Sequence, residues 1–86
     1  MPYRLKATGR ALRELKRLPP RIEGRLRDAI EDLAHEPRPP GCKKLRGGTG
    51  WRVRVGDYRV IYQVDDSARV VIVLRAGHRR DIYRGR

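Results

Sequence analysis

The chain has 86 residues, 38% of them hydrophobic and 37% charged, which suits one small domain over residues 1–86. Its 22 Lys and Arg against 10 Asp and Glu give a net charge of +12, which favours a polyanionic partner: nucleic acid, an acidic protein or an anionic membrane surface. A single cysteine excludes an intrachain disulfide and a cysteine-based zinc cluster, and neither a bilayer-spanning run nor an apolar secretory signal occurs, so we expect a cytoplasmic protein.

The N-terminal half of the sequence predicts a strand followed by two helices. Apolar and basic residues alternate over residues 3–6, which is typical of a short strand with one covered face. Thr8 is a candidate N-cap for the first helix, which ends at Pro19 and Pro20 because the residue before a proline is disfavoured in the α region. A 3–4 spacing of apolar residues predicts a second helix over about residues 20–35, followed by a stiff connector.

The C-terminal half of the sequence predicts a sheet, because apolar residues there recur with a period of about 2 residues instead of about 3.6. The run from residue 69 to 75 is apolar on both faces, so we expect it to be the central, most covered strand. We expect a non-helical tail after it. The predicted fold is α+β in the order β-α-α-β-β-β, a helical hairpin packed on a small, twisted, mainly antiparallel sheet. The expected strands after the helices are residues 51–55, 58–64 and 69–75, and residues 44–46 could form a further short strand.

Strand alternation predicts where the arginines point. The apolar residues of 51–55 need burial against the helices, so Arg52 and Arg54 stand on the opposite face. A tight turn at residues 56–57 brings Arg59 to the same face. Two interpretations remain open for this surface: an ordinary solvated face of an antiparallel sheet, or a phosphate-binding surface that uses the planar, two-pronged guanidinium group.

No familiar catalytic motif occurs in the sequence. The patterns GxSxG, CxxC and HxxxH and the phosphate-binding loop GxxxxGK[ST] are all absent. His78 follows the last predicted strand, where loop residues often carry function, and it is either an active-site residue or an ordinary loop residue.

Two segments together carry a family resemblance. The run WRVRVGDYRVIY, residues 51–62, followed by Gly77-His78-Arg79 and Asp81-Ile82-Tyr83, resembles the RelE-like branch of the RelE/ParE toxin superfamily. The resemblance covers essentially the whole chain. It implies the toxin of a type II toxin–antitoxin module, a ribosome-dependent mRNA endonuclease that cuts mRNA in the A site and inhibits translation. It also implies a cognate antitoxin, which the charge of the chain predicts to be acidic, and a possible toxin–antitoxin hetero-oligomer.

The resemblance implies roles for particular residues. Relatives often have lysine at the positions of Arg52 and Arg54, so this chain departs from them there. Because arginine is effectively never neutral, His78 is the only nearby group suited to proton transfer, unless the ribosome or the substrate supplies it. We expect metal-independent chemistry, no cofactor and no membrane partner. The candidate catalytic residues are Arg52, Arg54, Arg59, Arg79, Tyr83 and His78, and the candidate RNA-binding residues are Lys43, Lys44, Arg46, Tyr58 and Arg80.

Two other functions compete with the nuclease. A ParE-like toxin would inhibit DNA gyrase and cut nothing, and a basic RNA-binding module would need the arginine surface without catalysis. The nuclease predicts that Arg59 and Arg79 are exposed donors aimed at the scissile phosphate.

Overall fold

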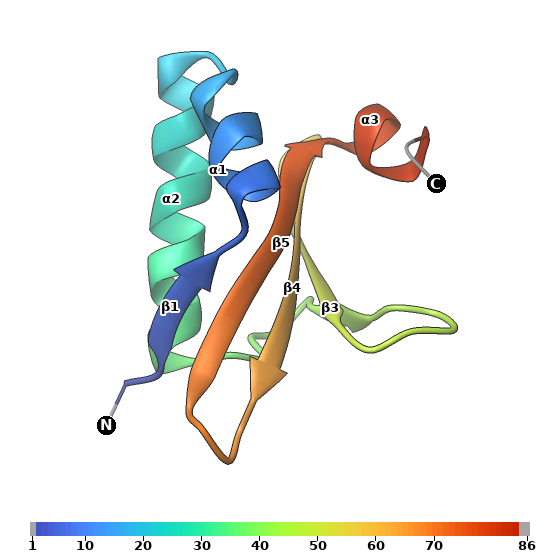
Figure 1. Cartoon of the computed structure of the whole chain (residues 1–86). Coiled ribbons are helices and arrows are strands. Elements are labelled where there is room, and N and C mark those ends of the chain that lie inside the picture. Colours follow the sequence, from blue (N-terminus) through green and yellow to red (C-terminus); the bar gives the residue numbers. More distant parts are fainter. Residues whose placement is uncertain (1, 85–86) are drawn as a thin grey trace.

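Two helices cover one face of a five-stranded sheet (Figure 1). The structure is a computed structural model that describes residues 2–84. The strand order is β1-β5-β4-β3-β2, with β1 parallel to β5 and every other pair antiparallel. The predicted α+β fold is confirmed. The elements are β1 (Arg4–Ala7), α1 (Gly9–Lys16), α2 (Pro20–His35), β2 (Lys43–Lys44), β3 (Trp51–Val55), β4 (Tyr58–Asp65), β5 (Val70–His78) and α3 (Arg79–Arg84).

The last strand and the tail differ from the prediction. β5 runs to His78, and α3 follows it directly where the sequence predicted a non-helical tail. The reason is cross-strand pairing, because the first residues of β4 bond to residues 75–78 and continue the ladder beyond the apolar run. β5 is an interior strand between β1 and β4, but β4 holds the central position because β3 and β2 add to its other side.

Local sequence explains where the helices begin. The Thr8 side chain accepts the N–H of Ala11 at 3.1 Å and so caps α1. α2 starts at Pro20, in the first turn, where the missing N–H of proline has no helical partner to lose. Within the described residues no helix is long and apolar enough to cross a bilayer.

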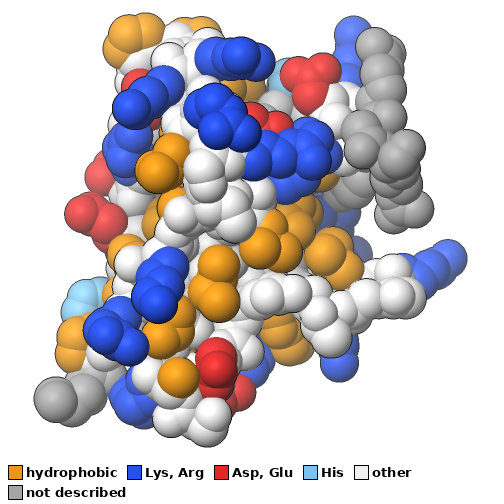
Figure 2. Space-filling view, viewed as in Figure 1, with side chains coloured by type: hydrophobic (Ala, Val, Ile, Leu, Met, Phe, Trp, Pro, Cys, Tyr) orange, Lys and Arg blue, Asp and Glu red, His pale blue; other side chains and the backbone are white. Residues whose placement is uncertain are grey.

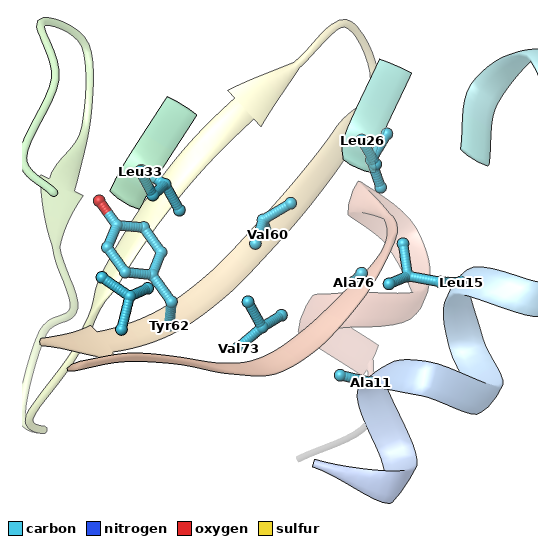
Figure 3. Packing of buried hydrophobic residues seen from close by; sticks show 9 residues of the cluster. Ala11, Leu15, Leu26, Leu33, Val60, Tyr62, Val73 and Ala76 are labelled. Atoms are coloured by element: carbon cyan, nitrogen blue, oxygen red, sulfur yellow. The ribbon is translucent and has the colours of Figure 1, made fainter. Parts of the chain in front are cut away.

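The hydrophobic core lies between the helical hairpin and the inner faces of β4 and β5 (Figure 3). Tyr62 is fully buried there, and its hydroxyl donates to the carbonyl of Pro37 at 2.7 Å. Burial raises the pKa of the Tyr62 phenol, so this hydroxyl stays protonated as a donor. This cluster lies on the helix-covered face of the sheet, and the side chains on the opposite face include Arg52 and Arg54. The core residues that converge in Figure 3 include Ala11, Leu15, Leu26, Leu33, Val60, Tyr62, Val73 and Ala76.

Strand β1 pairs with only the first half of β5. Thr8 and Glu14 form hydrogen bonds with the backbone along the rest of that edge. β1 pairs with residues 70–73. Beyond them, the Thr8 hydroxyl donates to the carbonyl of Leu74 at 3.0 Å, and the Glu14 carboxylate accepts the N–H of Ala76 at 3.0 Å. Backbone groups that would otherwise be unpaired are therefore bonded to side chains of the helical hairpin.

The opposite end of the sheet is held by a cluster of polar contacts. Arg38 donates to both oxygens of Asp66, at 2.7 and 3.2 Å, and Tyr3 donates to the same carboxylate at 2.7 Å. These bonds hold the pKa of Asp66 below its ordinary value. The Arg38 guanidinium also lies 5.2 Å from the centre of the Trp51 ring. Arg38 therefore links the connector after α2 to the β4–β5 turn and to β3.

We expect Glu14→Ala to lower the free energy of unfolding by about 2–3 kcal/mol. The substitution leaves the N–H of Ala76 unpaired and removes the partner of Arg75, which donates to Glu14 at 2.9 Å. Guanidinium denaturation measures the change. Glu31→Ala, which removes an exposed carboxylate from α2, is the control and should stay within about 0.5 kcal/mol of the parent. Equal losses in the two variants would contradict the role of Glu14.

Candidate functional site

Arginines gather on the sheet face that the α1–α2 hairpin leaves uncovered. Arg54 stands directly opposite Arg59 in the β3–β4 ladder, and Arg52 stands opposite Ile61. Opposed residues of antiparallel strands share a face, so Arg52, Arg54 and Arg59 lie together, as alternation predicted. We call these three residues, with Arg75 opposite Ile61 on β5, the arginine face.

Arg59 is buried, with 6% of its surface exposed, and the expectation of an exposed donor was wrong. Its Nη1 donates to the carbonyls of Gly56 at 3.1 Å and Tyr58 at 2.9 Å. These two bonds hold the turn between β3 and β4, where Gly56 has a φ of 61°. The Nε atom of Arg59 is buried and has no partner among the described residues.

Helix α3 explains why this end of the arginine face is covered. Gly77 lies opposite Arg59 in the β4–β5 ladder. Ile82 of α3 is 6% exposed, and its Cδ1 lies 3.8 Å from the position that a Cβ on Gly77 would take. The helix therefore folds back onto the sheet beside Arg59, and the sequence did not predict this because no helix was expected there.

Arg79 begins α3 and is exposed, as predicted. Its N–H donates to the carbonyl of Asp57 at 2.9 Å, which attaches the start of α3 to the β3–β4 turn. Arg54 is also exposed, and none of the ion pairs among residues 2–84 involves Arg54, Arg59 or Arg79. Positive charge therefore remains uncompensated by ion pairs at this end of the sheet.

His78 lies on the other side of the sheet. It stands opposite Tyr58, and the two rings meet edge to face at 5.3 Å on the side that packs against the helices. Its Nδ1 accepts a hydrogen bond from the backbone N–H of Arg80 at 3.2 Å. The structure therefore does not bring His78 onto the arginine face, although both lie at the same end of the molecule.

A cleft of about 420 Å³ opens beside His78, between the α1–α2 junction and the ends of β4 and β5. Three charged residues that line it, Glu14, Arg17 and Asp81, are not among the candidate site residues chosen from the sequence. The local sequence pattern could not predict that these residues meet, because Glu14 and Arg17 are far from Asp81 in the chain. They line one cleft because α1 and α3 both pack against β5.

The remaining candidate residues belong to β2, to the segment that follows it and to α3. Lys43 stands opposite Arg52 and extends the face, whereas Lys44 stands opposite Trp51 and so lies on the other side. Arg46 is exposed in the segment between β2 and β3, which projects from the sheet in Figure 1. The backbone of Tyr83 belongs to α3, but its side chain lies outside the described part of the structure.

The donor groups of the described residues do not suit a metal centre. Within residues 2–84, no three His, Cys, Asp or Glu side chains come together as metal ligands could. The arginine face instead presents guanidinium groups, which donate hydrogen bonds and bind anions.

Comparison with known proteins places these features in a family. A family model described as the ParE toxin of the type II toxin–antitoxin system parDE matches residues 5–83. The toxin RelG of Mycobacterium tuberculosis is 44% identical over 88 aligned residues, which cover 98% of this chain and 99% of RelG.

Solved structures of two toxin–antitoxin complexes have the same fold. The RelBE2 complex of Mycobacterium tuberculosis matches with a TM-score of 0.83 and 36% identity, over 91% of this chain and 92% of that one. The archaeal RelE–RelB complex of Pyrococcus horikoshii matches with a TM-score of 0.80 and 34% identity, over 92% of this chain and 97% of that one.

We expect Arg59→Ala to lower the free energy of unfolding by about 1–3 kcal/mol, because it frees two turn carbonyls and empties a buried site. Arg79→Ala removes an exposed side chain and should change stability by less than about 0.5 kcal/mol. Thermal and chemical unfolding of both variants measure the difference. An Arg59→Ala protein as stable as the parent would show that the turn does not need this side chain.

Proposed function

Because this chain belongs to the RelE/ParE superfamily of type II toxins, in its RelE-like branch, we propose that it is a ribosome-dependent endoribonuclease. It would cut mRNA in the A site, stop translation and act in the cytoplasm as a single toxin domain over residues 1–86. The similarity to RelG and to two RelE-type complexes supports this branch of the superfamily.

The observation that carries the proposal is the cross-strand pair of Arg54 and Arg59. Like charges directly opposite each other repel, and the hydrogen bonds of Arg59 to the β3–β4 turn do not require a second arginine at position 54. A bound phosphate removes the repulsion and accepts several charge-assisted hydrogen bonds. Arg79 is exposed at the same end and adds a second exposed donor beside Arg54. RNA supplies a chain of phosphates that this surface fits.

RNA also supplies its own nucleophile. In the proposed reaction the 2′-oxygen forms a bond to the adjacent phosphorus, the bond from phosphorus to the 5′-oxygen breaks, and one proton moves from the 2′-OH to a base while another reaches the leaving oxygen. The guanidinium groups of Arg54 and Arg79 stabilise the charge that develops on the phosphate, which needs no metal ion. Both are permanently charged, so the substrate or the ribosome supplies the groups that exchange the protons.

We assign His78 a positioning role. Its Nδ1 caps the start of α3, so a ring that took up a proton at this nitrogen would lose the bond to Arg80. The cap fixes the first turn of the helix that begins with Arg79. His78 therefore acts on the phosphate through the position of α3.

A cognate antitoxin is the second proposed partner. The related structures are complexes of RelE-type toxins with RelB antitoxins. A surface of net charge +12 favours an antitoxin segment rich in Asp and Glu, and the two proteins together would form a hetero-oligomer.

A ParE-like gyrase inhibitor is the alternative function. It is favoured by one observation, since the matching family model carries the ParE description. A gyrase inhibitor does not need donors aimed at a scissile phosphate, so the two functions predict different behaviour of the arginine variants.

We expect the purified protein to cut mRNA on a programmed ribosome and Arg79→Ala to slow the single-turnover rate by about 100–1000-fold, the usual effect of losing one charge-stabilising donor. Arg27→Ala removes an exposed arginine that is paired with Glu23 on α2, and should cut at the parent rate. Primer extension locates the cuts. Intact mRNA together with loss of DNA supercoiling by gyrase would replace the nuclease with the alternative.

The positioning role of His78 has its own test. Asparagine is a good N-cap and cannot exchange a proton near neutral pH, so we expect His78→Asn to keep the cleavage rate within about threefold. His78→Ala removes the cap and should slow cleavage on the order of 10–100-fold. The pH–rate profile should be the same in all three proteins. Equal losses in both variants, with a titration limb that disappears, would assign proton transfer to His78.

A further inference from the structure

The edge of β4 has no partner strand at the end of the sheet away from Arg54 and Arg79. The pairing of β3 with β4 reaches no further than Trp51 and Tyr62, whereas β4 continues to Asp65. A cleft of about 530 Å³ opens along this gap, between the segment that joins β2 to β3 and the β4–β5 turn. We call it the edge cleft, and the lining residues on which the inference depends are Lys44, Thr49, Trp51, Gln63, Asp65 and Ile72.

The wall of the edge cleft beside β4 is fixed by backbone contacts. Gly50 is buried and has a φ of 145°, and a Cβ at this position would lie 3.1 Å from the carbonyl oxygen of Tyr62. Glycine allows both this φ and this close approach. The Gly50 carbonyl accepts the N–H of Leu45 at 3.0 Å, which closes the segment on itself. The segment is therefore held against β4, and Thr49 lies beside Gln63.

The side-chain amide of Gln63 has a fixed orientation in the cleft. Its Nε2 donates to the carbonyl oxygen of Thr49 at 3.3 Å and to the Thr49 hydroxyl at 3.1 Å. A carbonyl oxygen can only accept, so the NH₂ group must face Thr49. The other end of the amide, Oε1, is therefore offered to a ligand as a hydrogen-bond acceptor.

Asp65 provides a second acceptor on the same wall. It lies two residues after Gln63 in β4, and so on the same face of the strand. Its Oδ1 accepts the Ser67 hydroxyl at 2.8 Å and the N–H of Ala68 at 3.0 Å. These bonds hold the pKa of Asp65 below its ordinary value, so the carboxylate is charged and its second oxygen can accept from a ligand.

The edge cleft also supplies a donor and an apolar surface. Lys44 is exposed on β2, and its ammonium group can only donate. Trp51 and Ile72 are partly buried and line the same cleft. A planar, uncharged ligand fits this combination, since its faces contact apolar side chains while its edge meets Lys44, Gln63 and Asp65.

The set of donors and acceptors selects one nucleobase. Guanine carries the O6 acceptor next to two donors, N1–H and the exocyclic amine, along one edge. Adenine and cytosine have an unprotonated ring nitrogen in place of N1–H, which would face an acceptor of the cleft. Uracil has one N–H between two carbonyl oxygens, so it also brings an acceptor against an acceptor. Such a mismatch costs binding free energy, because a desolvated polar group is left without a partner.

Charge separates the edge cleft from the arginine face. Figure 2 shows acidic side chains at the end of the molecule where β4 turns into β5, whereas Lys and Arg side chains crowd the other end. The carboxylate of Asp65 repels a phosphate but accepts hydrogen bonds from the N–H groups of a neutral base. The cleft therefore suits a base, and the phosphates of the same ligand lie outside it.

We propose that the edge cleft binds a guanine base, with Lys44 donating to O6 and with Gln63 and Asp65 accepting from N1–H and the exocyclic amine. The base belongs to an RNA strand or to a free guanine nucleotide, which present the same edge. Trp51 and Arg54 are three residues apart on β3, about 10 Å, so a strand whose phosphates lie on the arginine face reaches the cleft within about three nucleotides. The inference goes beyond the proposed function, because binding of the base requires no cleavage.

The test measures guanine preference, defined as the ratio of the affinities for two probes that differ in one base. The RNA probes are 2′-O-methyl hexanucleotides, which lack the nucleophile for cleavage and carry one guanine or one adenine among uracils. The free-nucleotide probes are GMP and AMP. We expect the parent protein to prefer guanine roughly tenfold, the usual discrimination of a matched set of base contacts. A preference limited to the hexanucleotides identifies an RNA strand as the source of the base, and one shared by GMP admits the free nucleotide.

Two lysines that follow each other in β2 provide matched variants. Lys44→Met removes the proposed donor, whereas Lys43→Met removes the same charge from a residue that stands opposite Arg52, on the other side of the strand. We expect Lys44→Met and Gln63→Leu to reduce the guanine preference to less than about twofold. Lys43→Met should weaken the binding of both hexanucleotides equally and keep the preference. Thermal unfolding checks that all three variants are folded.

Replacement of guanine by inosine tests the acceptors without any substitution in the protein. Inosine lacks only the exocyclic amine, so we expect the parent protein to bind it about 5–10-fold more weakly. Equal binding of the guanine and inosine probes would overturn the proposal, as would equal guanine preferences in Lys43→Met and Lys44→Met. Guanine preference without cleavage of mRNA on the ribosome would remove the proposed nuclease and leave the edge cleft, whereas cleavage with no guanine preference would do the reverse.

Discussion

The carboxylate of Glu14 joins the helical hairpin to the edge of β5, and the functional end of the molecule is organised around it. One oxygen accepts a hydrogen bond from the backbone N–H of Ala76 at 3.0 Å, and the other accepts one from the guanidinium of Arg75 at 2.9 Å. Arg75 also donates to the carbonyl of Ile82 in α3 at 3.3 Å. A single half-buried carboxylate thus connects α1, β5 and the C-terminal helix. The position of α3 over the arginine face therefore depends on how the hairpin packs against the opposite face of the sheet.

Arginines at the two ends of the sheet differ in whether a carboxylate pairs with them. At one end Arg38 is bonded to Asp66 and stacked on Trp51, so its charge is used within the fold. At the other end Arg54 and Arg59 are opposed across two strands, where their like charges repel, while the hydrogen bonds of Arg59 stabilise the β3–β4 turn. Binding of a polyanion offsets this repulsion, because a phosphate brings negative charge and accepts hydrogen bonds from the exposed Arg54.

The burial of Arg59 changes how its role is understood. The side chain is bonded to the turn that also receives the N–H of Arg79 at the carbonyl of Asp57. Arg59 therefore supports the position of Arg79 as well as adding charge to the arginine face. Loss of Arg59 combines a structural effect with an electrostatic one, whereas loss of Arg79 removes an exposed charge alone. The stability measurements above distinguish the two kinds of residue before any activity is measured.

The sequence by itself determined the order of the main strands and helices and the face on which Arg52 and Arg54 lie. Both follow from local periodicity, because a strand alternates its faces and a helix repeats every 3.6 residues. Only the tertiary structure decided that β5 continues to His78, that α3 covers Arg59 and that His78 lies opposite Tyr58 on the helical side. These features depend on contacts between segments that the local pattern does not connect, above all between β5 and both β4 and α3. Periodicity carries no information about which distant residues meet.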